Sequence, residues 1–122
     1  MGGVTEMGRL TTHVLDIARG RPGAGMRIDL FALGQSRRLL ASVTTNEDGR
    51  ADKPLIEGSA FGAGQYELVF HAGAYFKAAG IPTANPPFLD EVPVRFAVAS
   101  AEAHYHVPLL VSPWSYSTYR GS

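Results

Sequence analysis

The feature that most constrains the fold is the way glycine and proline clusters divide this sequence into short extended segments. Most segments alternate apolar and polar residues, which is the period of a strand with one buried face. Val92, Val94, Phe96 and Val98, for example, take every second position. Turn signals recur about every ten residues, a spacing typical of antiparallel β-sandwiches. We therefore predict an all-β antiparallel sandwich with strands at residues 9–17, 26–33, 37–46, 65–72, 92–100, two terminal strands within 104–122 and a short strand near 55–56.

One segment departs from this pattern and predicts a helix. Residues 73–80, GAYFKAAG, place three alanines and a lysine between two glycines, which favours about two helical turns. No linker or repeat divides the 122 residues, so we expect one domain at residues 9–122. Residues 1–8, MGGVTEMG, lack the basic and apolar regions of a signal peptide, and we expect them to form a disordered extension.

The charge balance and the missing cysteines limit the partners and the compartment. Eleven Lys and Arg residues balance eleven Asp and Glu residues without a long run of either sign. This balance argues against a nucleic-acid surface or a polybasic membrane patch, and no apolar run reaches the roughly 18 residues of a membrane span. The absence of cysteine excludes disulfides and thiolate chemistry. We expect a cytoplasmic protein that acts on a small molecule, not on nucleic acid or a membrane.

Residues 104–111, HYHVPLLV, contain two of the four histidines. Because side chains alternate along a strand, His104 and His106 project from one face, and Tyr105 projects from the other. Such a pair is as typical of ordinary sheet residues as of a site. It is also a spacing found in zinc sites, with His13 as a third ligand, but no thiolate, carboxylate cluster or His-Glu-x-x-His helix accompanies it. We predict no metal or other cofactor, and zinc stays an alternative.

The chain ends in an aromatic segment, SPWSYSTYRGS, hinged at Pro113, whereas most termini are loose and polar. A terminus of this kind is expected to dock against the rest of the protein. If it is ordered, Ser122 brings a hydroxyl and a carboxylate, anionic at neutral pH, to one point. Arg50 follows the tight-turn signal Asp48-Gly49, which places it at a sheet edge. On spacing alone, this arginine is typical of a solvated charge.

Several segments together are similar to one known family. LTTHVLD at residues 10–16, ARGRPGAGMRIDLFAL at 18–33, TNEDGR at 45–50, GAYF at 73–76, HYHVPLL at 104–110 and the terminal YSTYRGS resemble the transthyretin-related 5-hydroxyisourate hydrolase family. The resemblance runs from about Leu10 to Ser122. HYHVPLL and the final YRGS are its specific parts, whereas TTHVLD and DGR alone would be weak.

This resemblance implies a transthyretin-like β-sandwich of two four-stranded sheets with one short helix. It implies a homotetramer with active sites at the interface between two dimers. It also implies a reaction, in which water opens the N1–C6 amide of 5-hydroxyisourate during urate breakdown and gives 2-oxo-4-hydroxy-4-carboxy-5-ureidoimidazoline. The family's catalytic residues match His13, Arg50, His106 and Ser122. Its substrate-binding wall matches His104, Tyr119, Arg120 and Gly121.

The chemistry of these residue types suits that reaction. Histidine transfers protons near neutral pH because its unperturbed pKa is about 6.5, so we expect His13 and His106 to share the acid and base roles. Arg50 is a permanent cation with fixed donors for a developing oxyanion. One alternative is a transthyretin-like protein that binds a small aromatic ligand, although such relatives lack the histidine pair and the YRGS ending. Another is a zinc-dependent hydrolase that uses His13, His104 and His106.

Overall fold

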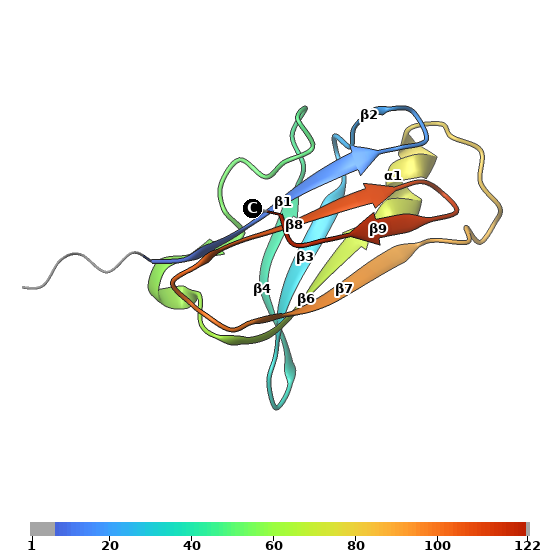
Figure 1. Cartoon of the computed structure of the whole chain (residues 1–122). Coiled ribbons are helices and arrows are strands. Elements are labelled where there is room, and N and C mark those ends of the chain that lie inside the picture. The colour runs from blue at the N-terminus through green and yellow to red at the C-terminus, as the bar shows by residue number, and fades with distance from the viewer. Residues whose placement is uncertain (1–6, 122) are drawn as a thin grey trace, which may run out of the picture.

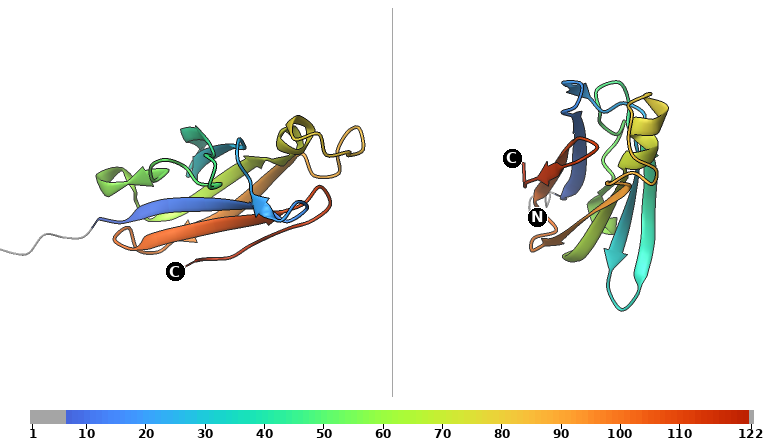
Figure 2. Two further views of the ribbon diagram at one scale, coloured as in Figure 1. Left: turned by 90° about the horizontal axis from the view of Figure 1, so that it is seen from above. Right: turned by 90° about the vertical axis from the view of Figure 1, so that its right-hand side faces the viewer.

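The protein folds into two β-sheets packed face to face (Figure 1). The structure, a computed structural model, describes residues 7–121. The first sheet contains β1 (Arg9–Asp16), β2 (Arg21–Pro22), β5 (Ile56–Glu57), β8 (His104–Val111) and β9 (Tyr116–Thr118). The second sheet contains β3 (Arg27–Leu33), β4 (Arg37–Thr44), β6 (Gly64–His71) and β7 (Glu91–Val98). Figure 2 shows the two layers from above and from one end of the molecule.

The alternation in the sequence produces the core between the sheets. Leu68 and Phe70 of β6 and Leu109 of β8 are fully buried there. Burying each such side chain contributes about 1.5–3 kcal/mol. Because this packing fixes which residues of β8 point inward, it also fixes which of them point outward.

A single α-helix, α1 (Ala72–Ala78), is found in the described residues, together with a 3-10 turn, η1, at Gly58–Ala60. A buried polar cluster fastens α1 to the end of β1. Asp16 accepts hydrogen bonds from the Tyr75 hydroxyl at 2.7 Å and from Nε of Arg19 at 2.9 Å. Burial raises the pKa of Asp16, but these hydrogen bonds outweigh burial and hold the pKa below its ordinary value. Within residues 7–121, no helix is long and apolar enough to cross a membrane.

The predicted all-β sandwich with one short α-helix is confirmed, with two differences in detail. The first sheet has five strands rather than four, because β2 and β5, of two residues each, both pair with β1. Prolines keep both pieces short, since Pro22 lies in β2 and Pro54 precedes β5. In addition, β1 and β8 run parallel rather than antiparallel. Most of the chain connects them, so no hairpin dictates their relative direction.

The predicted extension at residues 1–8 lies, for its first six residues, outside the described part of the chain. Gly8 is described, and its N–H donates to the backbone carbonyl of Ala101 at 3.0 Å. The domain boundary at residue 9 stays a prediction.

Candidate active site

The site is built on the parallel pairing of β1 and β8. In their register, Arg9 lies beside His104 and Thr11 beside His106, and His13 follows two residues further along β1. These side chains lie on the outer face of the first sheet, since the residues between them on both strands are buried. The prediction that His104 and His106 share one face is confirmed, and β1 adds a second row of side chains next to them.

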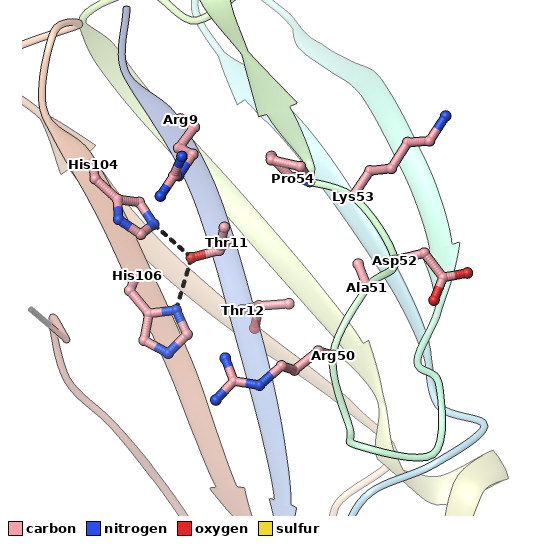
Figure 3. A pocket seen from close by; sticks show the side chains of 10 residues that line it. All are labelled: Arg9, Thr11, Thr12, Arg50, Ala51, Asp52, Lys53, Pro54, His104 and His106. Carbon is pink, nitrogen blue, oxygen red and sulfur yellow. Dashed lines mark hydrogen bonds between the residues drawn. The ribbon is translucent and has the colours of Figure 1, made fainter. Parts of the chain in front are cut away.

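One hydroxyl links the two histidines of β8. Oγ1 of Thr11 lies 2.8 Å from Nε2 of His104 and 2.8 Å from Nδ1 of His106 (Figure 3). The centroids of the two rings are 6.4 Å apart, so the rings are connected through Thr11 and not directly. Figure 3 shows the second nitrogen of His106, Nε2, on the side of the ring toward Arg50.

A tight loop after β4 presents Arg50. The side-chain oxygen of Asn46 accepts hydrogen bonds from the backbone N–H groups of Asp48 and Arg50, at 2.9 and 3.2 Å. Gly49, between these two, has a φ of 76°, in the left-handed region that glycine adopts without strain. The predicted turn at Asp48-Gly49 is confirmed, and Asn46 is the side chain that closes it.

The same loop docks onto β1. The carbonyl of Gly49 accepts a hydrogen bond from the N–H of Val14 at 2.8 Å, and an added side chain at Gly49 would collide with the backbone of Val14. Arg50 therefore forms a backbone bridge with His13. Its guanidinium extends across β1 toward His106 (Figure 3). A residue that is separated from His106 by half of the sequence thus reaches the same site.

His13 belongs to this junction of loop and strand. Its Nε2 lies 2.9 Å from the backbone carbonyl of Asp48. Because a carbonyl only accepts, Nε2 carries the hydrogen, and Nδ1 of the neutral ring holds the lone pair. The ring is partly buried, and His13 is not among the residues that line the pocket shared by Arg50, His104 and His106.

That pocket has a volume of about 420 Å³ and opens on the outer face of the first sheet. Thr11, His104 and His106 line it from the strands, and Arg50 lines it from the loop. Asp52, also in the lining, points away from the histidines (Figure 3). Within residues 7–121, imidazole, hydroxyl and guanidinium groups therefore converge without a side-chain carboxylate directed at them, which favours a polar ligand that carries or develops negative charge.

The end of the chain returns to the histidines. Beyond β9, the N–H of Gly121 donates to the backbone carbonyl of His106 at 2.7 Å, and the two residues form a bridge. The prediction of a docked terminus is confirmed through residue 121. Ser122, predicted to be catalytic, lies outside the described residues.

Two other predicted wall residues lie along a second groove. Tyr119 is exposed, and the guanidinium of Arg120 lies over the ring of Tyr105, 4.1 Å from its centroid. Both residues line a groove of about 230 Å³ beside β7, separate from the histidine pocket. Substrate binding by Tyr119 and Arg120 stays a prediction.

Gly121 offers a test of the contact between the terminus and the site. A Cβ added at Gly121 would lie 2.5 Å from Cδ2 of His106, so the ring or the terminus must shift. We expect Gly121→Ala to lower kcat/KM by about 10- to 100-fold, because small displacements of a reacting group are costly. Gly62→Ala is the matched control, since nothing lies within 4 Å of the added methyl group. Initial rates measure kcat/KM for both variants. An unchanged kcat/KM for Gly121→Ala would contradict a functional contact between Gly121 and His106.

The environment of the site disfavours protonated histidine. Burial lowers the pKa of His106, and the positive charges of Arg50, His104 and His13 lower it further. Burial and Arg50 also lower the pKa of His13, against a smaller opposing effect of Asp48. Burial and Arg9 lower the pKa of His104. At neutral pH, His106 and His13 are therefore held in the neutral form that accepts a proton.

Zinc ligation by His13, His104 and His106 is the other chemistry that the sequence allows for these side chains. Within residues 7–121, no group of three His, Cys, Asp or Glu side chains is placed to hold one metal ion. His13 instead donates to a backbone carbonyl, while His104 and His106 are bonded to Thr11. The prediction that no metal takes part stays a prediction.

Sequence reasoning did not identify Thr11 and Asn46 as parts of the site. The strand period does put Thr11 on the face of His13. Its contact with the β8 histidines depends on which strand lies beside β1, which the sequence pattern does not state. Asn46 carries a local signal, because asparagine side chains commonly bond the backbone two residues further on.

Curated relatives align with nearly the whole chain. A protein from Rhizobium meliloti (strain 1021) named 5-hydroxyisourate hydrolase 2 is 59% identical over 120 residues, which are 98% of this chain and 100% of the relative. A 5-hydroxyisourate hydrolase from Pseudomonas aeruginosa is 57% identical over 95% of this chain and 93% of the relative.

Three solved structures are similar to this chain in both fold and sequence. The structure of (S)-allantoin synthase has a TM-score of 0.92 and 48% identity over 97% of this chain, which spans only 45% of that longer chain. Klebsiella pneumoniae 5-hydroxyisourate hydrolase has a TM-score of 0.78 and 33% identity, over 93% of this chain and 99% of its own. Sea bream transthyretin in complex with thyroxine has a TM-score of 0.83 and 28% identity, over 93% of this chain and 94% of its own. The sequence model of the HIUase/Transthyretin family matches residues 10–121, which extend from β1 to the docked residue Gly121. This chain therefore belongs to the HIUase/Transthyretin family.

Proposed function

We propose that this protein hydrolyses 5-hydroxyisourate, opening its N1–C6 amide to give 2-oxo-4-hydroxy-4-carboxy-5-ureidoimidazoline in urate breakdown. The observation that carries the proposal is that Arg50 extends toward His106 within one pocket, on a chain 59% identical to a protein named 5-hydroxyisourate hydrolase 2. Hydrolysis of a cyclic amide needs a base for water, a donor for the oxyanion and a proton for the leaving nitrogen. Imidazole and guanidinium groups supply all three.

The steps of the reaction follow from these groups. A neutral imidazole, His106 or His13, accepts a proton from water while the water oxygen bonds to C6. Arg50 stabilises the negative charge that grows on the C6 oxygen. When the tetrahedral carbon collapses, the C6–N1 bond breaks, its electrons go to N1, and a protonated imidazole returns a proton to N1. In this proposal Ser122 and its carboxylate complete the wall, with no metal or other cofactor.

A spectrophotometric assay tests the activity. Urate oxidase generates 5-hydroxyisourate from urate, and a catalytic amount of this protein is added. We expect the absorbance of 5-hydroxyisourate to decay faster than it does spontaneously, in proportion to protein concentration. Decay at the spontaneous rate would overturn the proposal. Saturable binding of a small aromatic ligand without turnover would favour the alternative, a transthyretin-like binding protein.

We further propose that the active protein is a homotetramer with its sites at the interface between two dimers. The histidine pocket opens on the outer face of a sheet, where a second copy could cover it. Phe88 and Trp114 support this proposal, since they are 69% and 58% exposed and their rings lie 6.0 Å apart. Large exposed apolar side chains that cluster in this way commonly mark protein interfaces. Light scattering of the purified protein measures its mass, and a monomeric mass would count against a tetramer.

The same proposal assigns residues 9–122 to the hydrolase domain and the protein to the cytoplasm. The family match over residues 10–121 supports the extent of the domain. The compartment is inferred from the sequence alone, because a chain without cysteine fits a reducing cytosol.

The dependence of rate on pH provides a separate prediction. The base must be neutral, and the environment lowers the pKa values of His106 and His13. We therefore expect kcat/KM to fall, as the pH is lowered, only below about 6.5, the ordinary value for histidine. In Arg50→Gln a positive charge is lost, so protonation becomes easier and the fall moves to higher pH. Initial rates with separately prepared substrate measure both profiles, and a fall centred above 6.5 in the unaltered protein would contradict this assignment.

A further inference from the structure

Thr11 is the one side chain of residues 7–121 that is hydrogen-bonded to both histidines of β8. Its Oγ1 is 2.8 Å from Nε2 of His104 and 2.8 Å from Nδ1 of His106. A hydroxyl has one hydrogen, so when both rings are neutral it donates to one nitrogen and accepts an N–H bond from the other. The position of the proton on one ring therefore dictates its position on the other.

We propose that Thr11 joins His104 and His106 into one proton-sharing unit, in which His104 stores the proton that His106 takes from water. The inference rests on the proposed hydrolysis and adds to it a positioning residue and a route for the proton. It gives His106 both the base role and the acid role, one after the other.

Every proton in this route can be followed from donor to acceptor. At the start, Nδ1–H of His106 donates to Oγ1 of Thr11, the hydroxyl donates to Nε2 of His104, and Nε2 of His106 holds a lone pair. After Nε2 of His106 accepts a proton from water, its Nδ1 proton passes to Oγ1, and the hydroxyl proton passes to His104. His106 is then neutral with a hydrogen on Nε2, and His104 is the cation. Reversal of the transfer returns the proton through His106 to the leaving nitrogen.

The surroundings of the two rings favour transfer of the proton from His106 to His104. His106 is partly buried, and Arg50 extends toward it, so a lasting positive charge on its ring is costly. Fewer positive groups act on His104, since Arg9 lies beside it and lowers its pKa, whereas Arg50 and His13 both lower the pKa of His106. On the other side of His106, Figure 3 shows Nε2 toward Arg50, where the oxyanion is expected, so the nitrogen not bonded to Thr11 faces the reaction.

The kinetic test uses the full chain with three substitutions. Thr11→Val has the same shape as threonine without the hydroxyl, Thr11→Ser keeps the hydroxyl, and His104→Phe keeps a ring without nitrogen. We expect Thr11→Val and His104→Phe each to lower kcat by about 10- to 100-fold, less than loss of the base itself, and we expect the KM of Thr11→Val to stay within about twofold of the unaltered protein. The double variant should be no slower than either single one, because both remove the same route. Thr11→Ser should restore kcat, and Thr44→Val on β4 is the control.

A second measurement does not depend on turnover. Nitrogen NMR of the imidazole rings shows which nitrogen of His106 carries the hydrogen, without substrate. We expect His104→Phe to change this pattern when Thr11 is present and to leave it unchanged in Thr11→Val. Three results would each overturn the proposal. They are additive effects of the two substitutions on kcat, a kcat for Thr11→Val within about twofold of the unaltered protein, and an NMR pattern of His106 that is the same with and without His104. If the unaltered protein shows no activity, the proposed function fails, and the NMR measurement alone decides the link between the histidines.

Discussion

Replacing His106 by asparagine is expected to lower kcat by about 10²–10⁴-fold, the usual contribution of a positioned proton-transfer group. An asparagine amide can still reach Thr11 from the position of Nδ1, and the backbone carbonyl still accepts from Gly121. What is lost is Nε2, the nitrogen on the side of Arg50 (Figure 3). The fold and the docked terminus should therefore remain, and the loss should fall on the chemical step.

His71→Asn is the matched control for this prediction. His71 ends β6 in the other sheet, where its Nε2 lies 2.9 Å from Asp29. We expect kcat near that of the unaltered protein for this variant, while stopped-flow or initial-rate assays of His106→Asn show the loss. His13→Asn should also lower kcat if the two histidines share the proton transfers. Losses below tenfold for both His106→Asn and His13→Asn would refute the assignment of acid and base to them.

Replacing Arg50 by glutamine is expected to raise the barrier by about 3–4 kcal/mol, or 10²–10³-fold in kcat, as when one oxyanion donor is removed. Glutamine retains hydrogen-bonding groups but no charge. The loop itself should persist, because Asn46 bonds the backbone at Arg50 and not its side chain. The effect should thus be electrostatic, without a large change in thermal unfolding temperature.

Two further variants separate charge from position. Arg50→Lys keeps a cation but loses the planar fork of donors, so we expect it to recover only part of the lost rate. Arg38→Gln removes an exposed arginine from β4 of the other sheet and should leave the rate unchanged. Steady-state rates of the three variants give the comparison. Full activity of Arg50→Gln would show that another group stabilises the oxyanion.

The strand period predicts the local part of this structure well. The alternation placed Val92, Val94 and Val98 inside, and it placed His104 and His106 together on one face, because the two faces of a half-buried strand differ in polarity. The turn at Asp48-Gly49 was equally predictable, since only glycine adopts such a conformation freely. The family resemblance then supplied the matches at His13 and Arg50.

Relations between distant strands could not be predicted in this way. The parallel register of β1 and β8 depends on the packing of the whole sandwich, and without it nothing connects Thr11 to His106. The direction of Arg120 also depends on long-range packing, because its guanidinium lies on Tyr105 rather than among the histidines. Periodicity describes which face a residue occupies, whereas neighbours across a sheet are decided by the tertiary fold.

The pairing of β1 with β8 also has a consequence for synthesis of the protein on the ribosome. Among the strands of the described residues, β1 emerges first, and β8 emerges after all the others except β9. Contacts between residues so far apart in sequence form late in folding. The second sheet can pair its own strands while the chain is still growing, but the pocket cannot form until β8 has left the ribosome and paired with β1. A nascent chain truncated before β8 should therefore be inactive, however much of the sandwich it has already formed.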